Sequence, residues 1–423
     1  MDNLHINTKA IQSGWQPKNG EPRVLPIYQS TTYKYDSSET IGKLFDLQEE
    51  GFFYTRLANP TVDAVEKKLA DMEGGVGAML TSAGQAASLF SILNICKSGE
   101  HFISSSAIYG GTYNLFSVTM KKMGISVTFI DQGASDDEIQ KAFKSNTKAI
   151  FGETLSNPSL RVFDIERFSK IAHKNNVPLI IDNTFATPVL CKPITHGADI
   201  VIYSTSKYLD GHAVSLGGAI VDSGNFNWEN GNFPDFTTPD DSYHGVVYAE
   251  AFGSSAYIVK ARTQLMRDLG CMMAPQNAFL LNLGMETLPL RMERHCQNAL
   301  EVAKYLKNHK KITWVNYPGL EDNDDHALAK KYLSNGASGV VSFGVQGGRK
   351  AAADFMDKLK LAAIVVHVAD ARTGVLHPAS STHRQLSDSQ LEESGVSPDL
   401  IRLSIGIEHV GDIIKDIEQA LGD

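Results

Sequence analysis

The sequence is poor in cysteine and has no long apolar segment. Its four cysteines, at positions 96, 191, 271 and 296, form no C-x-x-C pair. The N-terminus, MDNLHINTKAIQSG, is polar and lacks the apolar core of a secretory signal. The longest apolar runs, such as LAAIVV after Lys360, are too short to span a bilayer. We therefore expect a cytoplasmic protein with free, mostly buried thiols and no membrane partner.

Basic charge is also scarce. The chain has 39 Lys and Arg residues and 48 Asp and Glu residues, which gives a net charge of −9. This balance argues against nucleic acid as the main partner. The hydrophobic fraction of 42% and the charged fraction of 21% are typical of a globular protein with a sizeable core. A chain of 423 residues is long enough for about two or three domains.

Apolar periodicity divides the chain into three parts. Residues 1–60 are irregular, and we expect an N-terminal arm that contacts a neighbouring subunit. Over residues 61–260, short apolar runs alternate with helical stretches, which predicts an α/β domain with a mainly parallel seven-stranded sheet. The expected strands are AMLTSA, HFISSS, SVTFID, KAIFGET, PLIIDN, DIVIYST and GGAIVDS.

The remaining sequence predicts an insertion and a smaller domain. The segment 223–244 is rich in Asn, Pro, Asp and aromatic residues, and we expect a long surface insertion there. Residues 261–423 are predicted to form a C-terminal α+β domain, with strands at ITWVNYPG, GVVSFGV and LIRLSIGI.

Two side chains at predicted strand ends could serve a cofactor. Ligands of open α/β sheets bind outside the carboxyl ends of the strands, where Asp182 lies. Its carboxylate could pair with a protonated pyridine nitrogen, although Asp-Asn also simply begins turns. Lys207 follows the next strand and could form a Schiff base if it is buried, whereas most lysines stay in solvent. Ser204 and Ser206 beside it offer hydroxyl groups to a phosphate.

Two further strand ends supply a phosphate site and an aromatic ring. In TSAGQAAS, Gly84 turns the chain and Gln85 opens a helix whose free N–H groups would attract a phosphate. The same pattern is also an ordinary strand-to-helix connection. Tyr109, in IYGGTYN, could stack on a planar cofactor or be a half-buried loop residue.

As a set, these motifs resemble one enzyme family. YTRLANPT, SAGQAA, YGGTYN, ETLSNP, DNTFATP, STSKYLDGH and RLSIGIE occur in the order found in pyridoxal-phosphate (PLP) enzymes of Cys/Met metabolism, over nearly the whole chain. The insertion NFNWENGNFPDFTTPDDSYHG and the run METLPLRMERH resemble the O-acetylhomoserine sulfhydrylase branch. The resemblance implies an aspartate-aminotransferase-like fold (fold type I), PLP as cofactor and a homo-oligomer, a tetramer of catalytic dimers.

The resemblance also implies residue roles. Lys207 would hold PLP as a Schiff base and carry protons, assisted by Tyr109, which stacks on the ring. Asp182 would face the pyridine nitrogen, with Thr184 beside the ring. Asn157 would lie near the phenolic oxygen, and Arg402 would bind the substrate carboxylate. The expected phosphate ligands are Gly84, Gln85, Ser204 and Ser206, together with Tyr54 and Arg56 from the neighbouring subunit. Ala83 departs from the family, where many relatives carry serine.

The implied reaction is a γ-replacement, in which sulfide or a thiol displaces acetate from O-acetylhomoserine. The sulfur could also come from a carrier protein with a thiocarboxylate end. Methionine γ-lyase and cystathionine γ-synthase or lyase activities use the same site and remain alternatives, as does a PLP-fold binding protein without turnover. Arg372 stands where the cystathionine enzymes tend to carry glutamate. An arginine there would repel the second ammonium of cystathionine, unless it points into solvent.

Overall fold

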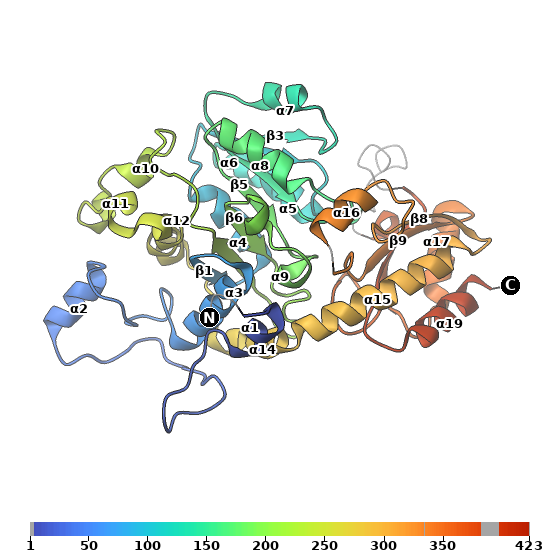
Figure 1. The fold of residues 1–423 in the computed structure, drawn as a ribbon, viewed down its shortest axis with the longest axis horizontal. Coiled ribbons are helices and arrows are strands. Elements are labelled where there is room, and N and C mark those ends of the chain that lie inside the picture. Colours follow the sequence, from blue (N-terminus) through green and yellow to red (C-terminus); the bar gives the residue numbers. More distant parts are fainter. Residues whose placement is uncertain (1–3, 334, 382–396, 423) are drawn as a thin grey trace.

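The structure, a computed structural model, describes residues 4–333, 335–381 and 397–422. Figure 1 shows a larger α/β body and a smaller one, joined along the long helix α15. Within the described residues, no helix is long and apolar enough to cross a membrane.

The larger body is built on the predicted seven-stranded sheet. Its strand order is β1-β7-β6-β5-β4-β2-β3, and only β7 runs antiparallel to its neighbours. All seven expected strands are confirmed. They are β1 (Gly77–Thr81), β2 (His101–Ser105), β3 (Ser126–Ile130), β4 (Thr147–Glu153), β5 (Leu179–Asp182), β6 (Ile200–Tyr203) and β7 (Gly218–Asp222).

Both faces of this sheet are covered, as a parallel sheet requires. Successive residues of a strand point to opposite faces, so Ile180 and Ile181 belong to two different apolar clusters. One cluster includes residues of α3 (Pro60–Glu73) and α8 (Ile165–Lys174), and the other includes residues of α4 (Gly84–Leu93) and α12 (Ala256–Lys260). The other helices between the strands are α5 (Gly110–Asn114), α6 (Met120–Lys122), α7 (Asp136–Ala142) and α9 (Thr187–Leu190).

Helix α3 shows how local sequence sets these elements. The Asn59 side chain accepts a hydrogen bond from the Thr61 backbone N–H, and Pro60 occupies the first helical position. The helix ends at Gly74, whose φ of 88° favours glycine. Both ends of α3 are therefore set by local sequence, at Asn59 and at Gly74.

The segment 223–244 is more deeply packed than its composition predicted. Trp228, Phe233 and Phe236 are buried, and the Trp228 ring stacks on Phe236 and on Tyr257 of α12. The expectation of a surface insertion was therefore wrong for its aromatic residues, because burying large rings stabilises the fold. The segment and its continuation include α10 (Pro234–Thr237) and α11 (Tyr248–Phe252).

The smaller body contains a five-stranded sheet in the order β10-β11-β12-β9-β8. The three expected strands are confirmed as β8 (Ile312–Asn316), β9 (Val340–Val345) and β12 (Leu400–Ser404). The short strands β10 (Ala363–Ile364) and β11 (Gly374–Leu376) were not anticipated, because each has too few residues to show alternation. The helices after residue 274 are α14 (Pro275–Glu286), α15 (Leu288–Lys307), α16 (His326–Tyr332), α17 (Gly348–Lys358) and α19 (Val410–Leu421).

The expected boundary near Ala261 falls within a helical run. Helix α12 continues as a π-helical turn, Ala261–Met266, and then as α13 (Arg267–Leu269). Helix α14 packs against α3 of the larger body, while the smaller sheet begins only at β8. The division into residues 61–260 and 261–423 stays a prediction.

The N-terminal arm divides into a packed start and an extended remainder. Helix α1 (Ile6–Gln12) packs on α3, and Lys9 forms an ion pair of 2.7 Å with Asp71. Beyond it the chain runs away from the body and carries α2 (Ser38–Phe45) at its outer end (Figure 1).

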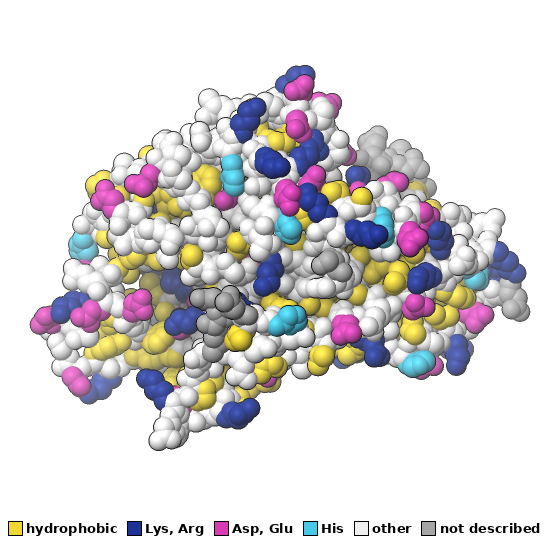
Figure 2. All heavy atoms as spheres, viewed as in Figure 1, with side chains coloured by type: hydrophobic (Ala, Val, Ile, Leu, Met, Phe, Trp, Pro, Cys, Tyr) yellow, Lys and Arg dark blue, Asp and Glu magenta, His cyan; other side chains and the backbone are white. Residues whose placement is uncertain are grey.

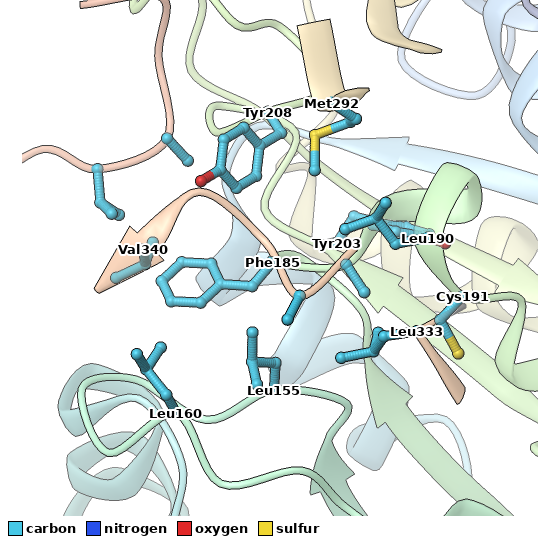
Figure 3. Packing of buried hydrophobic residues seen from close by; sticks show 14 of the residues in the cluster. Leu155, Leu160, Phe185, Leu190, Cys191, Tyr203, Tyr208, Met292, Leu333 and Val340 are labelled. Carbon is cyan, nitrogen blue, oxygen red and sulfur yellow. The ribbon is translucent and has the colours of Figure 1, made fainter. Parts of the chain in front are cut away.

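The two bodies share one apolar core. Figure 3 shows Leu155, Leu160 and Phe185 of the larger body beside Val340 of the smaller one, with Leu333 nearby. Burial of such side chains stabilises the fold by roughly 1.5–3 kcal/mol each. This core holds the carboxyl edge of the large sheet in a set position against the smaller sheet.

Candidate active site

The predicted cofactor residues of the larger body gather at one edge of its sheet. Asp182 ends β5, Ser204 and Lys207 follow β6, Gly84 follows β1, and Tyr109 follows β2. Because these four strands are mutually parallel, their carboxyl ends meet at this edge.

Lys207 is a partly buried lysine with a histidine next to its amine. Its Nζ lies 3.3 Å from Nδ1 of His367, which belongs to the smaller body. Burial lowers the pKa of Lys207 to about 8, and the nearby Arg402 charge acts in the same direction. A substantial fraction of this amine is therefore neutral near pH 8, as a nucleophile requires.

Asp182 and Thr184 form the centre of the edge. Oδ1 of Asp182 accepts hydrogen bonds from the backbone N–H (2.9 Å) and the hydroxyl of Thr184. The Thr184 hydroxyl oxygen in turn accepts from the Ser204 backbone N–H at 2.8 Å, which links β5 to β6. Burial raises the pKa of the Asp182 carboxyl, against the opposing effect of the Thr184 hydrogen bonds.

A second carboxyl group, missed by the sequence analysis, belongs to Glu153. It pairs in register with Asp182, and its Oε1 accepts from the Tyr109 backbone N–H at 2.7 Å. Burial first, and the Asp182 charge second, raise the pKa of Glu153. A glutamate ending a strand carried no local signal, because its partner lies on another strand.

The predicted phosphate residues lie close together. A Cβ atom at Gly84 would come 2.7 Å from the Cβ of Ser204, so only glycine permits this approach. No side chain caps the first turn of α4, because Ala83 stands at its N-cap. Its N–H groups and dipole therefore favour an anion. Ser206 is buried, and its hydroxyl exchanges hydrogen bonds with the Gly217 backbone.

Tyr109 and Gln85 flank this turn. A Cβ at Gly111 would lie 2.5 Å from the Tyr109 ring and 2.9 Å from Nε2 of Gln85, which places all three residues together. The Tyr109 ring is 49% exposed, so it offers a face to a planar ligand.

Arg402 reaches the site from β12 of the smaller body. It is only 6% exposed, and its NH1 group donates to Oδ1 of Asn157 at 3.0 Å. Its Nε is buried and has no hydrogen-bond partner among the described residues. A buried guanidinium with a free donor suits a carboxylate ligand.

Tyr54 and Arg56 do not join this group within one chain. The Arg56 guanidinium lies 5.1 Å from the centroid of the Tyr54 ring. Among the described residues, no hydrogen bond, ion pair or ring contact connects either one to the other predicted site residues.

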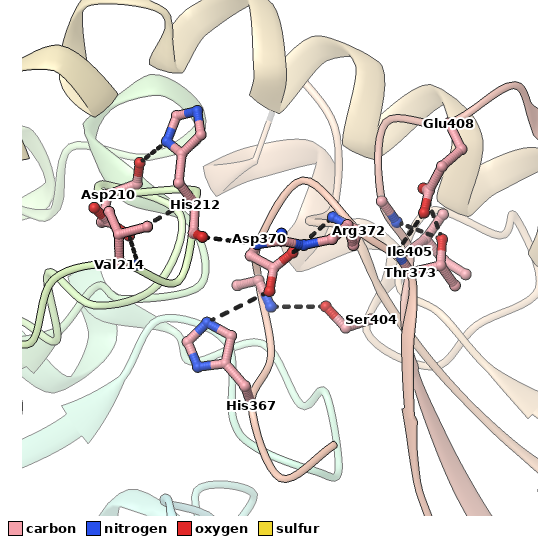
Figure 4. A network of polar contacts seen from close by, with 12 residues as sticks. Asp210, His212, Val214, His367, Asp370, Arg372, Thr373, Ser404, Ile405 and Glu408 are labelled. Atoms are coloured by element: carbon pink, nitrogen blue, oxygen red, sulfur yellow. Dashed lines mark hydrogen bonds and ion pairs between the residues drawn. The ribbon is translucent and has the colours of Figure 1, made fainter. Parts of the chain in front are cut away.

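Arg372 lies in the loop between β10 and β11, where it is hydrogen-bonded. Its side chain is 70% exposed, and NH2 donates to the His212 carbonyl at 2.7 Å. Its Nε lies 3.4 Å from Oδ1 of Asp370. Figure 4 shows Arg372 and Asp370 in this loop, facing the turn that carries His212.

These residues fit PLP. The uncapped turn of α4 suits its phosphate, and the half-exposed Tyr109 ring suits its plane. The partly buried Asp182 carboxyl suits a protonated ring nitrogen, and the depressed pKa of Lys207 suits attack on its aldehyde.

Comparison with known proteins agrees with this fit. Residues 7–422 match the family described as Cys/Met metabolism PLP-dependent enzyme. The chain is 46% identical to O-acetyl-L-homoserine sulfhydrylase of Leptospira meyeri, over 99% of this chain and 97% of that protein. It is 45% identical to homocysteine synthase of Schizosaccharomyces pombe, over 100% and 99% of the two chains.

A solved structure from Campylobacter jejuni, of a candidate O-acetylhomoserine (thiol)-lyase, superposes with a TM-score of 0.95 and 39% identity. The match covers 99% of this chain and 100% of that one, which contains N'-pyridoxyl-lysine-5'-monophosphate.

Proposed function

Since this chain belongs to the family of Cys/Met metabolism PLP-dependent enzymes, we propose that it transfers sulfur to O-acetylhomoserine. Sulfide, or a thiol, replaces acetate at Cγ, which gives homocysteine, or methionine when the thiol is methanethiol. The main support for this proposal is a sequence identity of 46% to a protein named O-acetyl-L-homoserine sulfhydrylase, over 99% of this chain.

The site residues divide the work of binding. Lys207 holds the cofactor, Asp182 faces its ring nitrogen, and Tyr109 stacks on its ring. Thr184 lies beside the ring and Asn157 near its phenolic oxygen. Arg402, with its unpartnered buried Nε, binds the carboxylate of the amino-acid substrate. The phosphate is held by Gly84, Gln85, Ser204 and Ser206, and by Tyr54 and Arg56 of a second subunit.

When bound, PLP supplies an electron sink for negative charge at Cα and Cβ of the substrate. Lys207 transfers protons to and from the substrate. Its Nζ takes up the α-proton and returns a proton to the substrate at the end. A β-proton also leaves, with solvent water as its acceptor, and acetate departs from Cγ with the bonding electron pair. Hydrogen sulfide ion then adds at Cγ, and the returned protons complete homocysteine.

The proposal extends to assembly and location. We place the enzyme in the cytoplasm as a homotetramer of catalytic dimers, in which the arm of one subunit completes the site of another. The separation of Tyr54 and Arg56 from the rest of the site in one chain supports a shared site. Free sulfide is the proposed donor, and methanethiol or a carrier protein with a thiocarboxylate end are further candidates.

The direct test is an assay of the purified protein against four amino acids, each with and without sulfide. These are O-acetylhomoserine, O-acetylserine, O-succinylhomoserine and methionine. We expect homocysteine and acetate from O-acetylhomoserine only when sulfide is present. Sulfide-independent release of methanethiol from methionine would instead identify a γ-lyase. Efficient formation of cystathionine when cysteine replaces sulfide would identify a cystathionine synthase.

A further inference from the structure

His367 is a titratable side chain with no role assigned so far, and it lies within hydrogen-bond distance of the Lys207 amine. It comes from the loop between β10 and β11, 160 positions from Lys207 in the sequence. Its Nδ1 lies 3.3 Å from Lys207 Nζ, and its Nε2 lies 3.9 Å from Oδ2 of Asp370. Figure 4 shows His367 and Asp370 on the same loop, with a dashed line joining the two side chains.

From this geometry we propose that His367 is the proton-transfer partner of Lys207. This inference rests on the proposed role of Lys207 and deepens the proposed function. The N–H bond of Lys207 breaks and one to Nδ1 of His367 forms; the same proton returns later in the cycle. The imidazolium then carries a positive charge, which the Asp370 carboxylate stabilises across 3.9 Å.

The charges around His367 favour its neutral, proton-accepting form. Burial and the Lys207 charge lower the pKa of His367, as does Arg402, while Asp370 and Asp210 raise it. The imidazole is therefore neutral near pH 7. In a neutral ring whose Nδ1 accepts from the amine, Nε2 carries the hydrogen. That Nε2 is buried and has no hydrogen-bond partner among the described residues, and the Asp370 carboxylate lies 3.9 Å from it.

The backbone holds the loop in place for this contact. Ala369, between His367 and Asp370, has a φ of 70°, which is uncommon for a residue other than glycine. Its N–H donates to the Ser404 hydroxyl at 2.7 Å, and the Ala371 N–H donates to the Gly211 carbonyl at 2.9 Å. The loop is thus tied both to β12 and to the turn after Lys207.

Two substitutions of His367 distinguish a role as hydrogen-bond acceptor from a role in proton transfer. In His367→Asn, an amide oxygen can still accept from the lysine ammonium, but it does not titrate. In His367→Leu, a side chain of similar size offers no acceptor. His173→Asn is the matched control, because His173 also pairs with a carboxylate, Asp199 at 2.8 Å, on α8 away from the site.

The first measurement does not depend on turnover. In PLP-free protein, the pH dependence of Lys207 labelling by trinitrobenzenesulfonate is followed by mass spectrometry of its peptide. We expect the labelling midpoint to move to lower pH in His367→Leu, because the ammonium loses an acceptor, and to stay near wild type in His367→Asn. An unchanged midpoint in His367→Leu overturns the contact.

The second measurement is the exchange of the α-hydrogen of alanine, which has no γ leaving group, with D₂O in the holoenzyme. Both His367 variants should exchange about 100-fold more slowly than wild type, as expected for loss of a general base. The acid limb of the pH profile should disappear with them. Wild-type exchange in His367→Asn overturns the proton transfer. If the wild type exchanges the α-hydrogen normally but forms no homocysteine, the proposed substrate is wrong. The proposed role of His367 in proton transfer would still stand.

Discussion

Glu153 and Asp182 lie opposite each other in the register of β4 and β5, so two carboxyl groups share the edge that holds Lys207. Glu153 also accepts the Tyr109 backbone N–H at 2.7 Å. The pair therefore connects the proposed ring-stacking residue to the proposed partner of the ring nitrogen. Burial raises the pKa of both carboxyls, and the Asp182 charge raises that of Glu153 further, so an ionised Asp182 disfavours ionisation of Glu153.

Glu153→Gln should preserve the site, because an amide oxygen can still accept from the Tyr109 N–H. Removing the repulsion should also make Asp182 easier to ionise. Glu153→Ala removes the acceptor of the partly buried Tyr109 N–H, which should cost about 1 kcal/mol of unfolding free energy. Urea unfolding of the two variants checks this. Equal destabilisation by both substitutions would show that the hydrogen bond is unimportant.

Asp182→Asn should reduce kcat by about 100-fold or more, because an amide cannot stabilise a protonated ring nitrogen as a carboxylate does. The urea midpoint should change little. Asp222→Asn is a matched control, since Asp222 is buried at the opposite end of the same sheet, on antiparallel β7. Steady-state kinetics of both variants decide the matter, and full activity in Asp182→Asn would contradict the assigned role.

Lys207 should attach PLP with a pH dependence set by its depressed pKa. Only the neutral amine reacts, so the rate of PLP attachment to apoprotein should rise with pH and level off above about 8. A solvent-exposed lysine would level off only above about 10.4. Lys207→Ala should fold normally but show no turnover and no borohydride-fixable PLP. Near-normal activity with borohydride-fixable PLP in that variant would assign the cofactor to another lysine.

A shared site predicts complementation between two inactive proteins. Arg56→Ala removes a proposed phosphate ligand supplied in trans, and Lys207→Ala removes the amine supplied in cis. After subunit exchange, about a quarter of the sites should carry neither lesion, if dimers form at random. Activity of the mixture measures this fraction. If exchange is demonstrated by mass spectrometry and no activity returns, the arm does not act across subunits.

Arg372 should disfavour cysteine as the sulfur donor, because the ammonium group of cysteine would approach the positively charged guanidinium. Its hydrogen bonds to Asp370 and His212 hold the guanidinium at this loop. We expect Arg372→Glu to raise kcat/KM for cysteine relative to sulfide at fixed O-acetylhomoserine. An unchanged ratio would leave Arg372 without this role, and efficient cystathionine formation by wild type would contradict the idea altogether.

Local sequence predicted much of the fold of the larger body and several residues of the site around Lys207. The seven strands were predictable because each has its own apolar run, with turn residues between runs. Asp182 and Lys207 could be placed together because strand ends of a parallel sheet share an edge. Composition misled only in the segment 223–244, whose aromatic residues pack on α12. Its many Asn and Asp residues are typical of surface loops, so its composition did not indicate that burial.

The tertiary structure decided which side chains act on these groups. Arg402 meets Asn157 across 245 positions, and His367 meets Lys207 across 160. Glu153 faces Asp182 only through strand register. None of these contacts leaves a periodic or local signal, because each depends on how two sheets and their loops pack. The sequence by itself therefore determined the sheet, the choice of Lys207 as the proposed cofactor lysine, and the family resemblance. Packing of the two bodies through their common apolar core decided the groups that surround the lysine, including His367.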